Sequence, residues 1–193
     1  MSTNGDRGRL FVAASLPDGV RAELARWARL AAVGRLGVRR LEPETLHLTL
    51  CFLGDQPLSC VSELAGVLGG AVEAVAGIGE LALGAPAWLP PRRPRALAVE
   101  IGDPEGALRS LQGLLAADIA ATIDWQPGTQ RFRPHVMVAR MRPASTRLGT
   151  GERPGELVPT PQLSFACEKV VLLASHLERE GARYEELASV GGW

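Results

Sequence analysis

The sequence carries no excess of charge of either sign. Its 21 lysine and arginine residues equal its 21 aspartate and glutamate residues, so the formal net charge at pH 7 is zero. Proteins that hold a long nucleic-acid duplex through its phosphates are usually clearly basic. The charge balance therefore argues against a long duplex as the partner. It favours a small anionic molecule, or only the end of a nucleic acid.

The features of membrane and secreted proteins are also missing. No uninterrupted apolar run approaches the ~20 residues that cross a bilayer, and the polar segment 1–6 lacks the apolar centre of a signal peptide. The three cysteines, Cys51, Cys60 and Cys167, show neither a C-x-x-C spacing nor the even count of a disulfide framework. We therefore expect a cytoplasmic protein with reduced thiols and no membrane partner.

What the chain does contain is an ordinary globular composition with alternating helices and strands. Its 193 residues are 46% hydrophobic, and we expect a single domain over 1–193. Apolar residues at helical spacing predict helices over 18–32, 58–75 and 105–121, with Leu30 and Leu114 among the buried positions. Strands are predicted at 9–15, 38–41, 46–54, 81–83, 96–101, 131–140, 168–175 and 182–190.

Turn residues separate these strands. Gly and Pro predict breaks at 54–57, 86–95 and 176–181, and a loop over 143–161. The last two strands are predicted to form an antiparallel hairpin. Such connections favour a mixed or antiparallel α+β fold over a doubly wound parallel one. No G-x-G-x-x-G or Walker phosphate loop is present.

Two of the three histidines lie inside apolar, strand-like runs. Successive side chains in a strand point to opposite faces, so His47, Thr49 and Cys51 are predicted to share one face of their strand, and His135, Met137 and Ala139 one face of theirs. Imidazole is the side chain whose unperturbed pKa lets it give or take a proton near neutrality. Two such groups on separate strands suggest an acid/base pair across a groove.

These runs resemble a known family. The segments 47–50 (HLTL) and 52–54 (FLG) are similar to the first signature of the 2H phosphoesterases, and 134–140 (PHVMVAR) resembles the second. The chain most resembles the RNA 2′,3′-cyclic phosphodiesterases, also called 2′-5′ RNA ligases. Further similarity lies in the segments 9–13, 94–97, 175–177 and 181–185.

The resemblance implies a bilobal α+β fold, with two antiparallel sheets and flanking helices around a central groove. It implies that His47 and His135 open a 2′,3′-cyclic phosphate to a 2′-phosphate end without metal or cofactor, with His47 as acid and His135 as base. Some members also join RNA ends. The implied partner is an RNA end or a small cyclic nucleotide, and we expect a monomer.

Two further residues are candidates for binding the substrate phosphate. Thr49, on the face of His47, can donate a hydrogen bond to a non-bridging oxygen. Arg140 matches an arginine of the family's second motif, but strict alternation points it away from His135. It reaches the groove only if the strand bends or ends near Ala139; otherwise it is a solvated charge.

One position departs from the family pattern. The second motif usually has Thr or Ser two residues after the histidine, where this chain has Met137. A thioether cannot donate a hydrogen bond, and one lost donor in a preorganised site costs about 10²–10³ in rate. An alternative reading is therefore a weakly active or inactive module that binds an RNA end or nucleotide. A third treats both histidines as packing residues.

Other candidate sites have weaker support. A zinc site from His47, His135 and either Cys51 or His176 matches no metal spacing, and we expect no metal. His176 is predicted to lie in a surface turn. Side chains that could stack on a base or meet RNA phosphates, but could equally be core or surface residues, are Trp88, Trp125, Tyr184, Arg92, Arg93 and Arg95.

Overall fold

The structure is a computed structural model, and it describes residues 6–33, 37–75, 77–91, 93–141, 157–178 and 181–191. Most of the predicted loop over 143–161 and the turn residues 179–180 lie outside these ranges. The strands are β1 Arg7–Ser15, β2 Val38–Arg40, β3 His47–Pro57, β4 Leu81–Leu89, β5 Ala96–Gly102, β6 His135–Met141, β7 Ser164–Phe165, β8 Lys169–Glu178 and β9 Gly181–Gly191. The helices are α1 Asp18–Ala31, α2 Val61–Val75 and α3 Ala107–Thr122, with short 3₁₀ turns η1 Pro43–Thr45 and η2 Leu58–Cys60.

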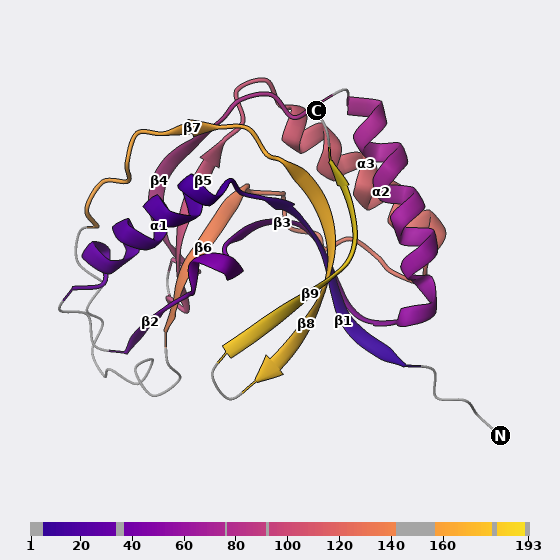
Figure 1. Cartoon of the computed structure of the whole chain (residues 1–193), viewed down its shortest axis with the longest axis horizontal. Coiled ribbons are helices and arrows are strands. Elements are labelled where there is room, and N and C mark those ends of the chain that lie inside the picture. Colours follow the sequence, from indigo (N-terminus) through magenta and orange to yellow (C-terminus); the bar gives the residue numbers. More distant parts are fainter. Residues whose placement is uncertain are drawn as a thin grey trace.

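Within the described residues, the strands form one curled antiparallel sheet in the order β7-β4-β5-β6-β3-β1-β8-β9, with β2 paired to β6 (Figure 1). The α+β class is confirmed. The prediction of two separate sheets is wrong. The pairing of Leu48 in β3 with Val136 in β6 joins the two halves into one sheet. This junction brings the two histidine strands side by side.

The helices cover one face of the sheet and leave the other open. Buried residues from α1, α2 and α3 share a single core cluster with the sheet. On the opposite, concave face, the described residues form a small buried cluster of Phe11, Ala13 and Val171. An open concave face is where a polar site can be placed without burying unpaired groups.

Helical spacing predicts most of the buried stripe correctly. On α3, Leu108, Leu111, Leu115 and Ile119 are fully buried at i, i+3 and i+4 intervals. Leu114, predicted in that stripe, is exposed. Leu30 on α1 is exposed in the same way, because each lies at the edge of its helix's apolar face, where the sheet no longer covers it.

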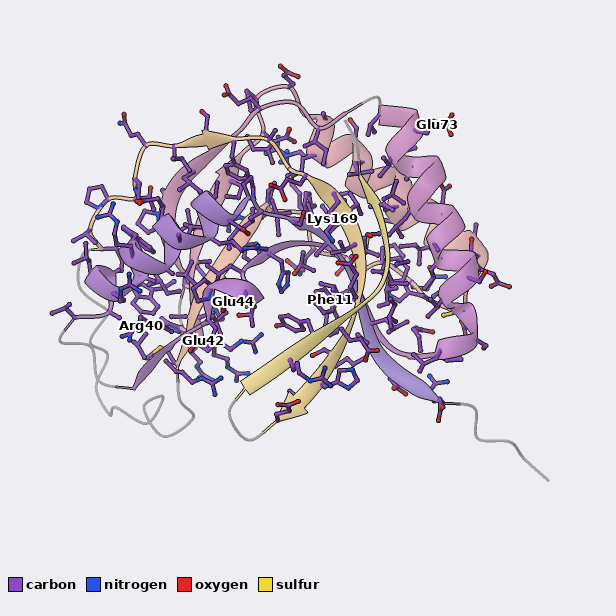
Figure 2. The ribbon with its side chains drawn as sticks, viewed as in Figure 1. Phe11, Arg40, Glu42, Glu44, Glu73 and Lys169 are labelled. Carbon is purple, nitrogen blue, oxygen red and sulfur yellow. The ribbon has the colours of Figure 1, made fainter. Side chains whose placement is uncertain are left out.

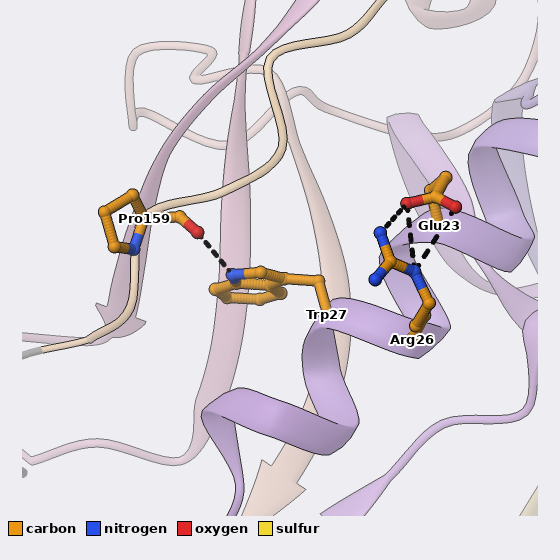
Figure 3. Close-up of polar contacts among 4 residues, drawn as sticks. All are labelled: Glu23, Arg26, Trp27 and Pro159. Atoms are coloured by element: carbon orange, nitrogen blue, oxygen red, sulfur yellow. Dashed lines mark hydrogen bonds and ion pairs between the residues drawn. The ribbon is translucent and has the colours of Figure 1, made fainter.

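Trp27 connects α1 to the last residues of the predicted loop over 143–161. Its indole is buried, and Nε1 donates hydrogen bonds to the carbonyl oxygens of Pro159, at 2.9 Å, and Val158, at 3.3 Å (Figure 3). On the solvent side of the same helix, Arg26 pairs with Glu23 at 2.6 Å. One buried anchor thus connects elements about 130 residues apart.

The segment Leu58–Val75 is long and apolar enough, by length and composition, to cross a membrane, contrary to the expectation from uninterrupted runs. In the fold, α2 buries Leu64, Leu68, Ala71 and Val72 in the core and packs against α3. A core helix passes the same test, so we interpret α2 as part of the domain core.

Pairing extends several strands past their predicted ends. β3 continues through Gly54 to Pro57, because Gly54 adopts a φ of 73° where the register with β1 shifts. β4 continues to Leu89 against β5. His176, predicted in a turn, lies in β8 and pairs with β9. Turn residues alone do not reveal these extensions, since cross-strand hydrogen bonds override local preference.

All three cysteines are buried and none of them forms a disulfide, as predicted for reduced thiols. Burial raises the pKa of Cys51 to about 11 and that of Cys167 to about 12. Because the thiolate is the reactive form, these thiols are structural rather than nucleophilic.

Candidate functional site

The two histidines come together across the β3–β6 pair. Leu48 and Val136 are direct partners in this antiparallel ladder. One residue away, the same register sets His47 opposite Met137 and Thr49 opposite His135. Directly opposite residues share a face, so both imidazoles lie on the concave face as diagonal neighbours. The Cα atoms of diagonal neighbours are about 7–8 Å apart, a spacing that lets two side chains hold one phosphoryl group between them.

Both rings are held in the same way. His47 Nδ1 lies 2.8 Å from the carbonyl oxygen of Thr45, and His135 Nδ1 lies 2.7 Å from that of Arg133. A carbonyl oxygen only accepts, so Nδ1–H is the donor in each ring. Each neutral imidazole therefore leaves Nε2 unprotonated and available for chemistry. The carbonyl stands two residues before the histidine in both motifs.

A β-bulge follows each histidine by three residues and changes which side chains face the site. Leu50 is the extra residue of β3 in its pairing with β1, and Val138 is the extra residue of β6 in its pairing with β5. One extra residue reverses the alternation beyond it. Arg140 therefore turns to the histidine face, as its predicted role required. Cys51 and Ala139 turn into the core, contrary to prediction, and Phe52 takes the position facing the site.

The concave face holds a cavity of about 230 Å³ against His47. Its lining includes the predicted phosphate-binding residues Thr49 and Arg140, together with Met137. His135 is not part of this lining and joins the site through its position opposite Thr49. The remaining lining residues are Arg9, Phe11, Phe52, Ser175, Leu177, Ala182 and Tyr184. Among these, Tyr184 is a predicted stacking candidate, whereas sequence reasoning missed Arg9, Phe52 and Ser175.

His47 is enclosed by two aromatic rings. Its ring centroid lies 4.9 Å from that of Phe11 and 5.1 Å from that of Tyr184, the latter edge-on. Burial lowers the pKa of His47, and the positive charges of Arg140 and His135 lower it further, while the hydrogen bond to Thr45 opposes the shift. The surroundings of His47 therefore favour its neutral form.

This lowered pKa makes stability depend on pH. Unfolded His47 regains an ordinary pKa near 6.5, so between its folded pKa and about pH 6.5 the unfolded chain binds more protons. We expect the contribution of His47 to the free energy of unfolding to be complete above about pH 6.5. It should be lost as the pH falls toward the pKa of His47 in the folded protein. Urea unfolding from pH 7.5 to 5.5 measures it. A His47→Gln variant should show a shallower decline, and an equal decline would contradict the assignment.

The remaining candidates lie elsewhere. Trp88 and Trp125 pack against the core, and Trp125 Nε1 donates to the carbonyl oxygen of Phe52 at 3.1 Å. His176 lies on β8 with Nε2 3.0 Å from Glu185. Arg93 and Arg95 line neither this cavity nor the larger one beside it, and Arg92 is outside the described residues.

The zinc alternative has no support in the described part of the chain. None of its groups of three or more His, Cys, Asp or Glu residues could hold a metal ion. Cys51, one of the two candidates for a third ligand, is buried on the face away from the histidines. The arrangement instead offers two imidazoles, a hydroxyl and a guanidinium around a space for an anion.

Comparisons with known proteins identify the family of this chain. Residues 16–179 match the family model of the 2′-5′ RNA ligase superfamily. An RNA 2′,3′-cyclic phosphodiesterase of Aeropyrum pernix is 28% identical over 170 residues, which cover 86% of this chain and 95% of that protein.

Solved structures show the same fold. E. coli LigT complexed with 3′-AMP superposes with a TM-score of 0.73 at 24% identity, covering 96% of this chain and 98% of LigT. The protein TT0787 of Thermus thermophilus gives 0.72 at 25% identity, covering 95% and 97%. Since the family model spans most of the chain and both histidine motifs, this protein belongs to the 2′-5′ RNA ligase superfamily, the 2H phosphoesterases that its motifs resemble.

Proposed function

We propose that this protein hydrolyses the 2′,3′-cyclic phosphate of an RNA end or a small nucleotide to a 2′-phosphate. The observation that carries this proposal is the histidine pair. Its two rings lie on one face of adjacent strands, and each has its Nδ1 engaged by a backbone carbonyl. The A. pernix relative, which is named an RNA 2′,3′-cyclic phosphodiesterase, supports this class of substrate.

Each group in the site has a role in this reaction. His135 takes a proton from the attacking water, and His47 gives one to the leaving O3′ as the P–O3′ bond breaks. The phosphate stays on O2′. Thr49 and Arg140, which line the cavity, hydrogen-bond the non-bridging oxygens. Burial keeps His47 neutral before substrate binds, and an anionic phosphate raises its pKa again, so the acid becomes charged as substrate binds.

The aromatic end of the cavity suits the nucleobase. Phe52 is 52% exposed although it is a large apolar side chain. The guanidinium of Arg9 lies 5.2 Å from its ring centroid. Aromatic faces and guanidinium planes are the surfaces on which unpaired bases stack. In this pose the base lies at the Phe52 end and the phosphate lies between the histidines.

The direct test is product analysis with adenosine 2′,3′-cyclic phosphate and with an oligonucleotide that ends in a 2′,3′-cyclic phosphate. We expect a 2′-phosphate product from both. A 3′-phosphate product would mean that the leaving oxygen is O2′ and would overturn the proposed orientation. The absence of any product, despite binding, would favour the alternative of a nucleotide-binding module limited by Met137.

A second expectation concerns metal ions. Because the imidazoles supply both proton transfers, the rate with adenosine 2′,3′-cyclic phosphate should be unchanged after treatment with excess EDTA and removal of the chelator. Added Mg²⁺, Mn²⁺ or Zn²⁺ should not increase it. A rate that collapses with EDTA and returns with one of these ions would show that the reaction depends on a metal.

A further inference from the structure

The two histidines of the site have the same local surroundings along the chain. His47 is the first residue of β3, and His135 is the first residue of β6. The ring of each is held through Nδ1 by the carbonyl oxygen two residues earlier. The proposed reaction needs one ring as acid and the other as base. A feature outside the two motifs must therefore make these rings unequal.

The difference between them is an aromatic pair beside His47. The ring centroids of Phe11 and Tyr184 are 5.1 Å apart, with their planes at 75°. The His47 ring lies 4.9 Å from the first and 5.1 Å from the second, so the three rings contact one another. In the part of the chain that the structure describes, His135 makes no such ring contact. We call Phe11 and Tyr184 the aromatic clamp.

The clamp is built apart from the main core. Phe11 lies on β1, where that strand pairs with β8, and its side chain is buried (Figure 2). It belongs to the small cluster of the concave face, against which Leu173 and Tyr184 pack. Tyr184 comes from β9, opposite Ser175 in β8. The first strand therefore supplies one ring and the C-terminal hairpin the other, and both meet at a histidine of β3.

We propose that Phe11 and Tyr184 are positioning residues that set His47 apart from His135 as the acid of the pair. This inference rests on the proposed function and extends it to residues outside the two histidine motifs. The hydrogen bond to Thr45 fixes Nδ1 of His47, and the two rings fill the space into which the imidazole would otherwise turn. The clamp thus holds Nε2 in one direction, toward the phosphate.

The clamp also controls the charge of His47. Apolar rings exclude water, and burial is the largest cause of the lowered pKa of this histidine. Aromatic faces attract a cation, and the hydrogen bond to Thr45 also favours the charged form, but the net effect is a lowered pKa.

The charges near His47 act in the same direction as its burial. The titratable and polar groups that face it from the neighbouring strands include no carboxylate, and Glu44 on η1 lines only the larger cavity. These groups are Arg9 on β1, Arg140 and His135 on β6, Ser175 on β8 and Tyr184 on β9. A bound phosphate therefore supplies the negative charge that restores the proton to His47.

The test follows the histidine Cε1–H signals of the free protein by NMR between about pH 4.5 and 8.5, with the His47 signal identified by its loss in His47→Gln. Tyr184→Ala opens one side of the clamp to water. The titration midpoint of His47 should rise toward its ordinary value near 6.5, and it should move further than that of His135.

The same variant should alter the kinetics with adenosine 2′,3′-cyclic phosphate. One limb of the pH profile of kcat/KM should move to higher pH together with the His47 midpoint, because that profile reports the free enzyme. The maximal kcat should fall by up to about 10², the cost of misplacing a reacting group by about 1 Å.

Three variants separate the clamp from a general loss of packing. Tyr184→Gln removes the ring, keeps much of the volume, and should move the His47 curve in the same direction as alanine. Tyr184→Phe keeps the ring and should retain the wild-type curve. Leu173→Ala removes an apolar side chain from the same cluster, outside the lining of either cavity, and should also retain that curve.

Several results would overturn the clamp. One is an unchanged His47 curve in both Tyr184→Ala and Tyr184→Gln, even if kcat falls, because a loss of rate alone is what a merely structural role produces. A shift of equal size in Leu173→Ala, or equal shifts of His47 and His135, would overturn it too. If the His47 curve moves as expected in a protein that opens no cyclic phosphate, control of His47 by the clamp stands and only the proposed hydrolysis is contradicted.

Discussion

Replacing either His47 or His135 with alanine should reduce the rate of cyclic phosphate opening by about 10²–10⁴. Each variant loses one of two coupled proton transfers, and the register leaves no other imidazole on this face of the β3–β6 pair to replace it. The double variant should lose little more than either single one, because groups that act as a unit are not additive. Initial rates with adenosine 2′,3′-cyclic phosphate measure all three.

Two controls make this result specific. His47 contacts Phe11 and Tyr184, so His47→Gln, which keeps more side-chain volume, should be equally inactive while retaining the wild-type circular dichroism spectrum. His176→Ala removes an imidazole paired with Glu185 outside the first cavity and should keep full activity. Full activity in either catalytic-histidine variant would remove the basis of the proposed mechanism.

Replacing Met137 with threonine should raise kcat, by up to about 10²–10³ if the wild-type site is limited by the missing donor. The register places position 137 directly opposite His47 and on the cavity lining. A hydroxyl there would mirror Thr49 opposite His135 and stabilise the charge that develops on the phosphate oxygens.

Met137→Leu separates the hydroxyl from a change in packing. Leucine keeps the volume and supplies no donor, so its rate should stay near that of the wild type. If threonine and leucine give the same rate, the missing hydroxyl does not limit turnover. A slow wild type that binds nucleotide tightly and is strongly activated by threonine would establish the binding-module alternative for the natural chain.

Much of the site is predictable because its chemistry is local. His47 and His135 are visible as imidazoles in alternating apolar runs, and Thr49 follows from the two-residue period of a strand. The carbonyls that hold both rings lie two residues earlier in each run. Periodicity also locates the buried positions of α3, apart from Leu114 at the margin of the stripe.

The bulges are not predictable from the pattern. Cys51 and Phe52 are both apolar, so either can be placed in the core without violating the alternation of β3. Arg140 is a correct candidate, but its direction depends on whether an extra residue interrupts β6. Only the cross-strand register decides that, since a shift of one residue reverses every side chain beyond it.

The chain alone determined the chemistry: two imidazoles and a hydroxyl at strand spacing, in a neutral protein without a nucleotide-binding loop. The folded sheet decided which of these groups meet. The pairing of Leu48 with Val136 joins β3 to β6 and so joins the two halves of the sheet. Irregular register turns Phe52 and Arg140 toward the histidines, and the β2–β6 pairing sets Arg39 opposite Arg140. The physical reason is that side-chain type is a property of the residue, whereas side-chain direction in a sheet is a property of the hydrogen-bonded neighbours.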